Sequence, residues 1–277
     1  MTAAYTVVEV VGGFLTGSLA LLADAAHMLS DNVSIALALV AVGLAGRPAT
    51  PERTYGYKRA EVLAALANGV TLVVLSIWIS YTAFRRFGDP PDVLSGWMLA
   101  IALAGIAVNV AAGAILFRAR SGNLNVEAAL RHVVADLLGS FAVAAAAVII
   151  LLTGWLVADP LVSVLIAALV LVGSWSILRD STAILLEAAP KGIDTRAVGE
   201  TLAAAPGVVE VHDLHVWTIT SGFPALSAHV LVGRDEDCHA RRRELERLLA
   251  EEFRLEHTTL QVDHVGDRDG LVEIGRF

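Results

Sequence analysis

The sequence has little charge and almost no cysteine. Of its 277 residues, 17% are charged and 56% are hydrophobic, whereas soluble domains carry about 25% charged residues. The single cysteine, Cys238, excludes an internal disulfide framework. The net charge of -8 and the lack of a basic tract argue against nucleic acid as a partner. The N-terminus has no basic segment before an apolar core, so a cleavable secretory signal is not expected.

Long uncharged runs indicate that the chain crosses a membrane. The longest, residues 93–117, exceeds the roughly 20 apolar residues that a spanning helix needs, which argues against a soluble helical protein. We therefore expect a membrane domain over residues 1–186, surrounded by lipid. The first two uncharged runs are short, and few residues precede the first predicted helix. This suggests that the start of the sequence is truncated. The six predicted helices are residues 3–23, 25–46, 61–84, 93–117, 126–153 and 159–179.

Lysine and arginine gather on one side of this predicted bundle. Basic residues of cytoplasmic loops set the orientation of membrane helices. Only Arg85 and Arg86 lie on the opposite side. Both termini are therefore expected in the cytoplasm, and the plasma (inner) membrane is the expected location. The basic residues on the cytoplasmic side are Arg47, Arg53, Lys58, Arg59, Arg118, Arg120, Arg131, Arg179 and Lys191.

The composition changes near residue 186. The stretch 187–194, "EAAPKGID", is typical of a linker. Two alternating segments flank the turn "TSGFP", and a strongly charged helix over 238–254 precedes a last strand. The order predicts a small cytoplasmic α+β domain (αββαβ) over residues 187–277. Cys238 would then lie in a reducing compartment as a free thiol.

Two polar pairs interrupt the apolar sequence. His27 and Asp31 are four residues apart, and so are His132 and Asp136. Residues at this spacing share one helix face, about 6 Å apart along the axis. Ionisable groups in hydrocarbon are costly and normally face the bundle interior. Together the pairs supply four nitrogen and oxygen ligands, the number that tetrahedral Zn²⁺ takes.

Several interpretations of these pairs remain open from the residues alone. One pair could form a helix–helix hydrogen bond or a proton relay, and two pairs could hold a fixed structural zinc. A transported ion explains better why the site lies within the membrane. Histidine must be neutral and carboxylates ionised to bind a metal, so metal binding releases protons. With an ordinary histidine pKa near 6.5, this chemistry favours exchange of metal for protons.

Two other function classes compete with transport. An intramembrane zinc enzyme typically has HExxH, which this sequence lacks, and it keeps one ligand position open for water. We therefore do not expect an enzyme. A membrane-embedded zinc sensor, with the cytoplasmic domain as its output, stays possible.

Several stretches resemble the cation diffusion facilitator family, the CzcD and ZnT type of zinc transporter. The similar segments include "VVEVVGGFLTGSLALLADAAHMLSD", "TYGYKRAEVLAALAN", "NLNVEAALRHVVADLLGS" and "VHDLHVWTITSG". The resemblance implies a homodimeric zinc/proton antiporter with six transmembrane helices and a metallochaperone-like cytoplasmic domain. It implies that His27, Asp31, His132 and Asp136 form the transport site, with zinc preferred. Whether Co²⁺ or Cd²⁺ also passes is left open.

The resemblance also implies a regulatory zinc site in the cytoplasmic domain. Its ligands would be His212, His229, His257 and Asp263, some of them supplied across the dimer. Strand alternation predicts His212 and Leu214 on one face and His215 on the other. The alternative is a set of ordinary surface histidines.

Five further residues receive structural expectations, and a sixth, Glu9, does not. Asp24, one turn before His27, is expected to cap the N-terminus of the second helix, with a role in the access path to the site as the alternative. Asp159, followed by proline, is expected to cap the sixth. Glu9 has no assigned role. Gly12, with Gly13 and Gly17, is expected to allow close helix packing.

Overall fold

The computed structural model describes residues 2–118 and 124–266. Two compact units divide the chain: residues 1–40 with 64–178, and residues 41–63 with the chain from 179 onward. The fold class predicted from the sequence, a bundle of six helices followed by an αββαβ domain, is confirmed. Arg120, part of the expected charge asymmetry, lies outside the described residues.

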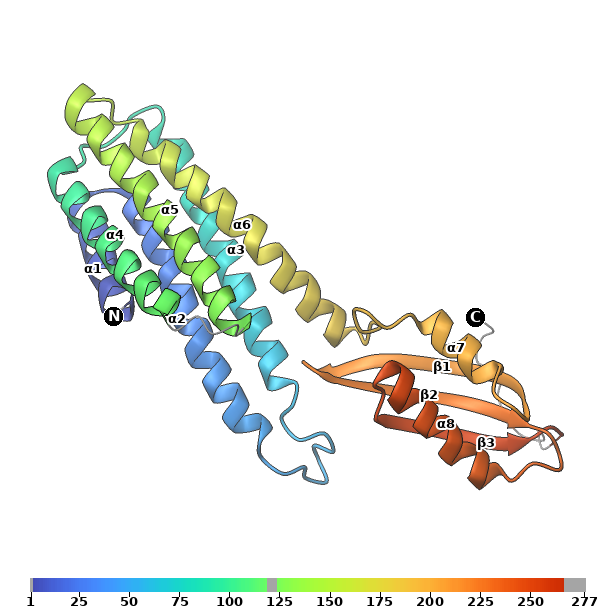
Figure 1. Ribbon diagram of the computed structural model, residues 1–277. Helices are drawn as coiled ribbons and strands as arrows, with labels where there is room; N and C mark the ends of the chain where they lie inside the picture. The colour runs from blue at the N-terminus through green and yellow to red at the C-terminus, as the bar shows by residue number, and fades with distance from the viewer. Residues whose placement is uncertain (1, 119–123, 267–277) are drawn as a thin grey trace. The chain divides into compact units, whose positions relative to one another are not determined.

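Six helices form the N-terminal part (Figure 1). Within the described residues, four are long and apolar enough to cross a membrane: α3, α4, α6 and residues 129–153 of α5. The chain is therefore an integral membrane protein. The helix bounds are α1 (Thr2–Thr16), α2 (Leu19–Ala45), α3 (Ala60–Arg86), α4 (Ser95–Arg118), α5 (Leu124–Thr153) and α6 (Ala158–Leu185).

The break between α1 and α2 lies earlier than predicted. The expected first helix over residues 3–23 is wrong, because α1 ends at Thr16 and α2 begins at Leu19. Gly17 takes φ +73°, a left-handed conformation that glycine adopts without steric cost. Asp24, expected as a cap, is instead buried inside α2.

Asp159 caps α2 rather than α6. Its carboxylate accepts hydrogen bonds from the backbone N–H groups of Leu19 (2.8 Å) and Ala20 (3.1 Å) and from the Ser18 hydroxyl (2.6 Å). The predicted role at its own helix is therefore wrong. Sequence reasoning missed it because the carboxylate and the N–H groups that it accepts from are 140 residues apart. The first turn of α2 is thus held by α6.

Arg86 neutralises this buried carboxylate. Its guanidinium lies 3.6 Å from Asp159 Oδ2 and donates a 2.7 Å hydrogen bond to the carbonyl of Gly17. The end of α3, the turn between α1 and α2 and the start of α6 therefore meet at one ion pair. Asp159 is only 1% exposed, so its charge depends on this partner.

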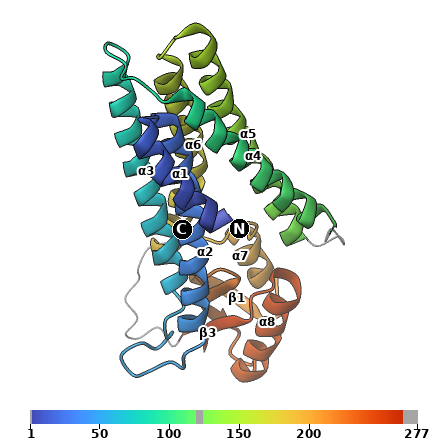
Figure 2. The same cartoon turned by 90° about the vertical axis from the view of Figure 1, so that its left-hand side faces the viewer.

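Glycine allows α1 to pack closely on α4 (Figures 1 and 2). A methyl group at Gly12 would overlap the side chain of Ile101, and one at Gly105 would overlap the ring of Tyr5. A methyl group at Gly13 would overlap Leu22 of α2. The packing predicted for Gly12 and Gly13 is confirmed, whereas Gly17 serves the turn.

The C-terminal part contains a three-stranded sheet in the order β1-β2-β3 (Figure 1). Strands β1 and β2 form an antiparallel hairpin, and β3 joins β2 in parallel. Helices α7 and α8 bury leucines such as Leu202, Leu245 and Leu249 against one face of the sheet. The opposite face is left for polar side chains. The bounds are α7 (Thr195–Ala203), β1 (Val208–Thr220), β2 (Phe223–Val232), α8 (Cys238–Phe253) and β3 (His257–His264).

We expect Asp159→Ala to destabilise the helical bundle by about 2–5 kcal/mol. The change removes a helix cap and leaves the partly buried Arg86 without its carboxylate. Thermal unfolding of the purified protein in detergent measures the loss. Asp89→Ala, an exposed aspartate that follows α3, is the matched control and should unfold at the wild-type temperature. Equal unfolding temperatures for both variants would contradict the proposed role.

Candidate metal centre

The two polar pairs face each other across α2 and α5 of the helical bundle. His27 Nε2 lies 3.6 Å from Asp31 Oδ2 and 3.6 Å from Asp136 Oδ1. His132 Nε2 lies 3.2 Å from Asp31 Oδ2 and 3.7 Å from Asp136 Oδ2. Each imidazole thus contacts the carboxylate of its own helix and that of the other. The structure brings all four predicted residues together.

The two separations that end on Asp31 Oδ2, 3.6 Å from His27 Nε2 and 3.2 Å from His132 Nε2, are close to the edges of a tetrahedral zinc site, whereas Asp136 approaches His27 with Oδ1 and His132 with Oδ2. Zinc binds histidine nitrogen and carboxylate oxygen at about 2.0–2.2 Å, so ligand atoms in a tetrahedron lie roughly 3.3–3.6 Å apart. The four distances between histidine nitrogen and carboxylate oxygen run from 3.2 to 3.7 Å. His27, Asp31 and Asp136 each offer one ligand atom, and these three atoms lie within 4.8 Å of one another. His27, Asp31 and Asp136 are therefore arranged for a small cation, and His132 adds a contact of 3.2 Å to Asp31 Oδ2.

The acceptor atoms of the site lack donors. Asp31 Oδ2 and Asp136 Oδ1 are buried and accept no hydrogen bond among the described residues. Asp136 is only 6% exposed, and only the imidazoles of His27 and His132 are near enough to pair with its charge among the described residues. The His132 side chain is 47% exposed, which leaves one side of the cluster open. A divalent cation would satisfy both carboxylates at once.

A second buried polar cluster lies one helical turn from this site. Glu9 of α1, Asp24 of α2, Asn109 of α4 and Ser140 of α5 are each at most 2% exposed. Asp24 precedes His27 by three residues, and Ser140 follows Asp136 by four. The two carboxyl groups were visible in the sequence as isolated charges. Nothing in the sequence indicated that Asn109 and Ser140 would join them from other helices.

His212 and His229 meet on the open face of the cytoplasmic sheet. They are paired directly across β1 and β2, and their ring centroids lie 5.3 Å apart. The predicted alternation beyond His212 is wrong. Asp213 takes φ +52°, and the register shifts so that His215 pairs with Ser227, on the same face of β2 as His229. His212 and His215 therefore share one face, while Leu214 packs into the core.

The bulge also places Asp213 among the histidines. Its carboxylate lies 2.9 Å from His215 Nε2 and 4.0 Å from His229 Nε2. Regular strand alternation would direct Asp213 away from His212, so the sequence pattern alone does not point to Asp213.

Of the other two predicted cytoplasmic ligands, Asp263 lies near His229 on the neighbouring strand and His257 lies far from it. Asp263 is two residues beyond Gln261, the partner of His229 on β3, so it is a diagonal neighbour at roughly 7 Å. Its carboxylate accepts a 2.7 Å hydrogen bond from the Gln261 amide. His257 pairs with Ala225, four residues from His229 along β2, a distance of about 13 Å. Within one chain, His257 does not join the pair formed by His212 and His229.

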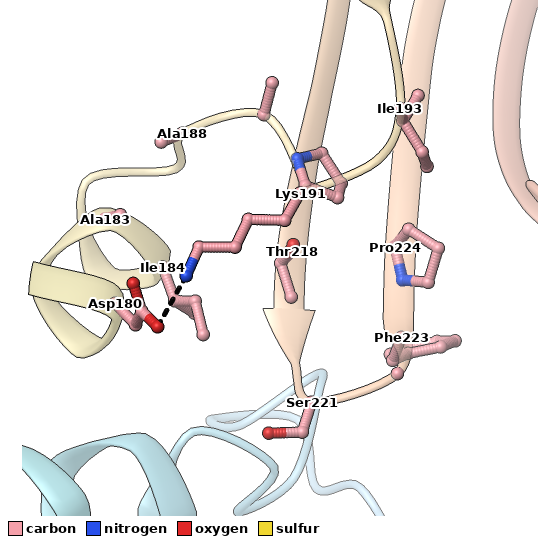
Figure 3. Close-up of a pocket in the computed structure, with 13 residues that line it drawn as sticks. Asp180, Ala183, Ile184, Ala188, Lys191, Ile193, Thr218, Ser221, Phe223 and Pro224 are labelled. Atoms are coloured by element: carbon pink, nitrogen blue, oxygen red, sulfur yellow. Dashed lines mark hydrogen bonds and ion pairs between the residues drawn. The ribbon is translucent and has the colours of Figure 1, made fainter. Parts of the chain in front are cut away.

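A cavity of about 480 Å³ lies elsewhere, between the end of α6, the linker and the β1–β2 turn (Figure 3). Lys191 reaches across it to Asp180, with Nζ 2.6 Å from Oδ2. None of the eight predicted metal ligands lines this cavity. An apolar wall with a paired lysine does not favour a cation.

We expect Co²⁺ to show the strong visible absorption of tetrahedral coordination when it occupies the α2–α5 site. Asp136→Asn removes one carboxylate ligand and should weaken binding by at least about 100-fold, because loss of supporting groups alone costs 10- to 100-fold. A titration of the purified protein followed by absorbance measures both effects. Glu127→Gln, an exposed residue on the same helix, should bind as wild type does. An octahedral spectrum in wild type would contradict the geometry.

Comparisons with known proteins cover nearly the whole chain. A family described as the cation efflux transmembrane domain matches residues 1–186, and the cytoplasmic domain of cation efflux proteins matches residues 190–265. A cadmium, cobalt and zinc/H(+)-K(+) antiporter of Bacillus velezensis is 41% identical, covering 95% of this chain and 85% of that protein. The zinc transporter ZitB of Escherichia coli is 42% identical, with 95% and 85% coverage.

The solved structures similar to this chain include one of a C-terminal domain. It is the metal-bound C-terminal domain of the CzcD transporter from Cuprividus metallidurans, 35% identical, with a TM-score of 0.25. The match covers 25% of this chain and 97% of that one.

Proposed function

The chain belongs to the cation efflux family, the cation diffusion facilitators that its sequence resembles, and we propose that it exports zinc in exchange for protons. It is not an enzyme. The observation that carries the proposal is the set of four distances between histidine nitrogen and carboxylate oxygen at the α2–α5 site. His27, Asp31, His132 and Asp136 are the proposed transport ligands. The names of the similar proteins, zinc transporter and zinc antiporter, support zinc as the substrate.

The chemistry of these ligands couples metal to protons. Two neutral imidazoles and two carboxylates bind Zn²⁺, whereas protonated imidazoles cannot. When the site opens to the more acidic side, protons replace the metal. When it opens to the cytoplasm, metal replaces the protons. A pH gradient across the membrane therefore drives zinc in the direction opposite to the flow of protons, toward the more acidic side.

The ligand set leaves room for other divalent cations. Nitrogen and oxygen donors in tetrahedral geometry also suit Co²⁺, and affinity alone does not separate such metals. The similar Bacillus velezensis protein is named for cadmium, cobalt and zinc. We propose Co²⁺ and Cd²⁺ as secondary substrates.

The proposed setting is the plasma membrane, with both termini in the cytoplasm and lipid around the bundle. The distribution of lysine and arginine between the loops supports this orientation. Residues 190–265 match a domain described as cytoplasmic. We propose that the protein works as a homodimer, as its family resemblance implies, and that nucleic acid has no part in its function.

We also propose a regulatory zinc on the open face of the cytoplasmic sheet. His212 and His229 are its first two ligands, and Asp263 lies within reach on the neighbouring strand. His257 takes no part within the same chain, since it lies about 13 Å along the sheet. His257 can join the cytoplasmic zinc site only from a second copy of the chain.

Zinc uptake into inverted membrane vesicles tests the transport function. With an acidic interior, wild type should take up zinc, and Asp136→Ala should reduce the rate at least about 100-fold because a metal ligand is lost. Glu127→Gln should transport as wild type. Equal rates with and without the pH gradient would refute proton coupling. Zinc binding without any flux would favour a sensor instead.

The cytoplasmic site has its own test, the number of zinc ions bound per chain. His212→Ala should lower this number by about one, because one member of the histidine pair is removed. The matched variant His257→Ala should bind zinc as wild type does if each site lies within one chain. If both variants lose zinc equally, the site is completed between two copies.

A further inference from the structure

The cavity between the end of α6, the linker and the β1–β2 turn has mostly apolar walls. Ala183 and Ile184 of α6 lie on one side and Phe223 and Pro224 of β2 on the other, with the Lys191 side chain between them (Figure 3). All of its lining residues belong to one compact unit. A hollow with apolar walls and a few polar groups is the usual form of a site for an organic ligand.

The cavity lies where α6 leaves the membrane. Residues 160–178 of this helix carry no charge, and Arg179 and Asp180 are the first charged residues after them. At the rise of an α-helix, Asp180 and Ala183 are about 3 Å and about 8 Å beyond Leu178. The headgroup region of one leaflet is roughly 5–8 Å thick. The wall that α6 forms is therefore at the depth of lipid headgroups.

The charged groups at the cavity carry an excess of positive charge. Lys191 Nζ lies 2.6 Å from Asp180 Oδ2, and Arg179 Nε lies 3.5 Å from Oδ1 of the same carboxylate. Lys58 Nζ lies 4.8 Å from the ring centroid of Phe223 and forms no ion pair with the described residues. Three cations therefore share one carboxylate.

The neighbouring carboxylates do not cancel this excess. Glu187 is paired with Arg59, whose Nη2 lies 2.9 Å from Glu187 Oε1. Asp194 and Glu61 lie at the N-termini of α7 and α3, where the helix dipole favours a negative charge. The positive charge at the cavity is therefore left for an anion from outside the chain.

An anionic phospholipid fits both features of the cavity. Basic residues that follow a membrane helix attract the negatively charged lipids of the adjacent leaflet. The Lys191 side chain is 71% exposed, so its ammonium group can meet a phosphate while its carbon stem covers the apolar wall. A small soluble anion would use the charge but leave the apolar walls without a partner.

We propose that this cavity binds an anionic phospholipid from the leaflet next to the C-terminal domain. The phosphate pairs with Lys191 and Lys58, and the glycerol and first acyl carbons contact Ala183, Ile184 and Phe223. The lipid bridges the end of α6 and the start of β2. This site is separate from the metal ligands, and the inference does not depend on zinc transport.

Photolabelling in lipid nanodiscs tests the proposal. The full-length protein is reconstituted in phosphatidylcholine with a small fraction of phosphatidylglycerol that carries a photoactivatable group near its glycerol. Mass spectrometry of peptides should find the label on residues 180–193 and 218–224. An excess of unlabelled phosphatidylglycerol should remove this label. An equal excess of phosphatidylcholine or of sn-glycerol 3-phosphate should leave it in place.

Variants test the contribution of charge. Lys191→Gln should lower labelling of these two segments about fivefold, and the further change Lys58→Gln should lower it about 20-fold in total, as expected for lysines near an anionic membrane surface. Lys191→Arg keeps the charge and should be labelled as wild type is. The matched control Arg118→Gln removes a cation from the end of α4 and should also be labelled as wild type is.

Three results would overturn the proposal. Equal competition by phosphatidylcholine, or equal labelling of Lys191→Gln and Arg118→Gln, would show that the cavity does not select an anionic lipid. Competition by sn-glycerol 3-phosphate at the same concentration would identify a soluble anion as the occupant. Labelling only outside residues 180–193 and 218–224 would place the lipid elsewhere.

Discussion

An ionised side chain in hydrocarbon needs a partner, and this requirement organises the helical bundle. Asp159 is nearly inaccessible to solvent and has three hydrogen-bond donors and an arginine. Asp136 faces two imidazoles. Each buried acid therefore holds two or more helices together. The same requirement leaves the α2–α5 carboxylates dependent on a metal or on protons.

The four proposed metal ligands lie on helices. Both members of each pair project from one helix, so no loop must move to create the site. The α2 helix is held at its start by Asp159 of α6 and by Arg86 of α3, through the turn at Gly17. A shift of α6 or α3 would therefore move His27 and Asp31. The bundle couples metal coordination to helix position through these contacts.

In the cytoplasmic domain a local irregularity creates the polar face. The left-handed residue Asp213 inserts one extra position into β1, which brings His212 and His215 to the same side. Without the bulge, His215 would point into the hydrophobic core. The histidines are thus separated from the leucines that α7 and α8 bury.

The sequence by itself determined the class of protein, the six helices and the αββαβ domain, and it selected the four residues proposed for the α2–α5 site. These follow from short-range rules: the length of an uncharged run, and the four-residue spacing that puts two side chains on one helix face. Only the tertiary structure decided that Asp159 caps α2, that Asp24 is buried beside Glu9, and that Asp213 resets the register of β1. Each depends on groups brought together from distant parts of the chain, or on a single backbone angle. No periodic pattern of residues encodes such contacts.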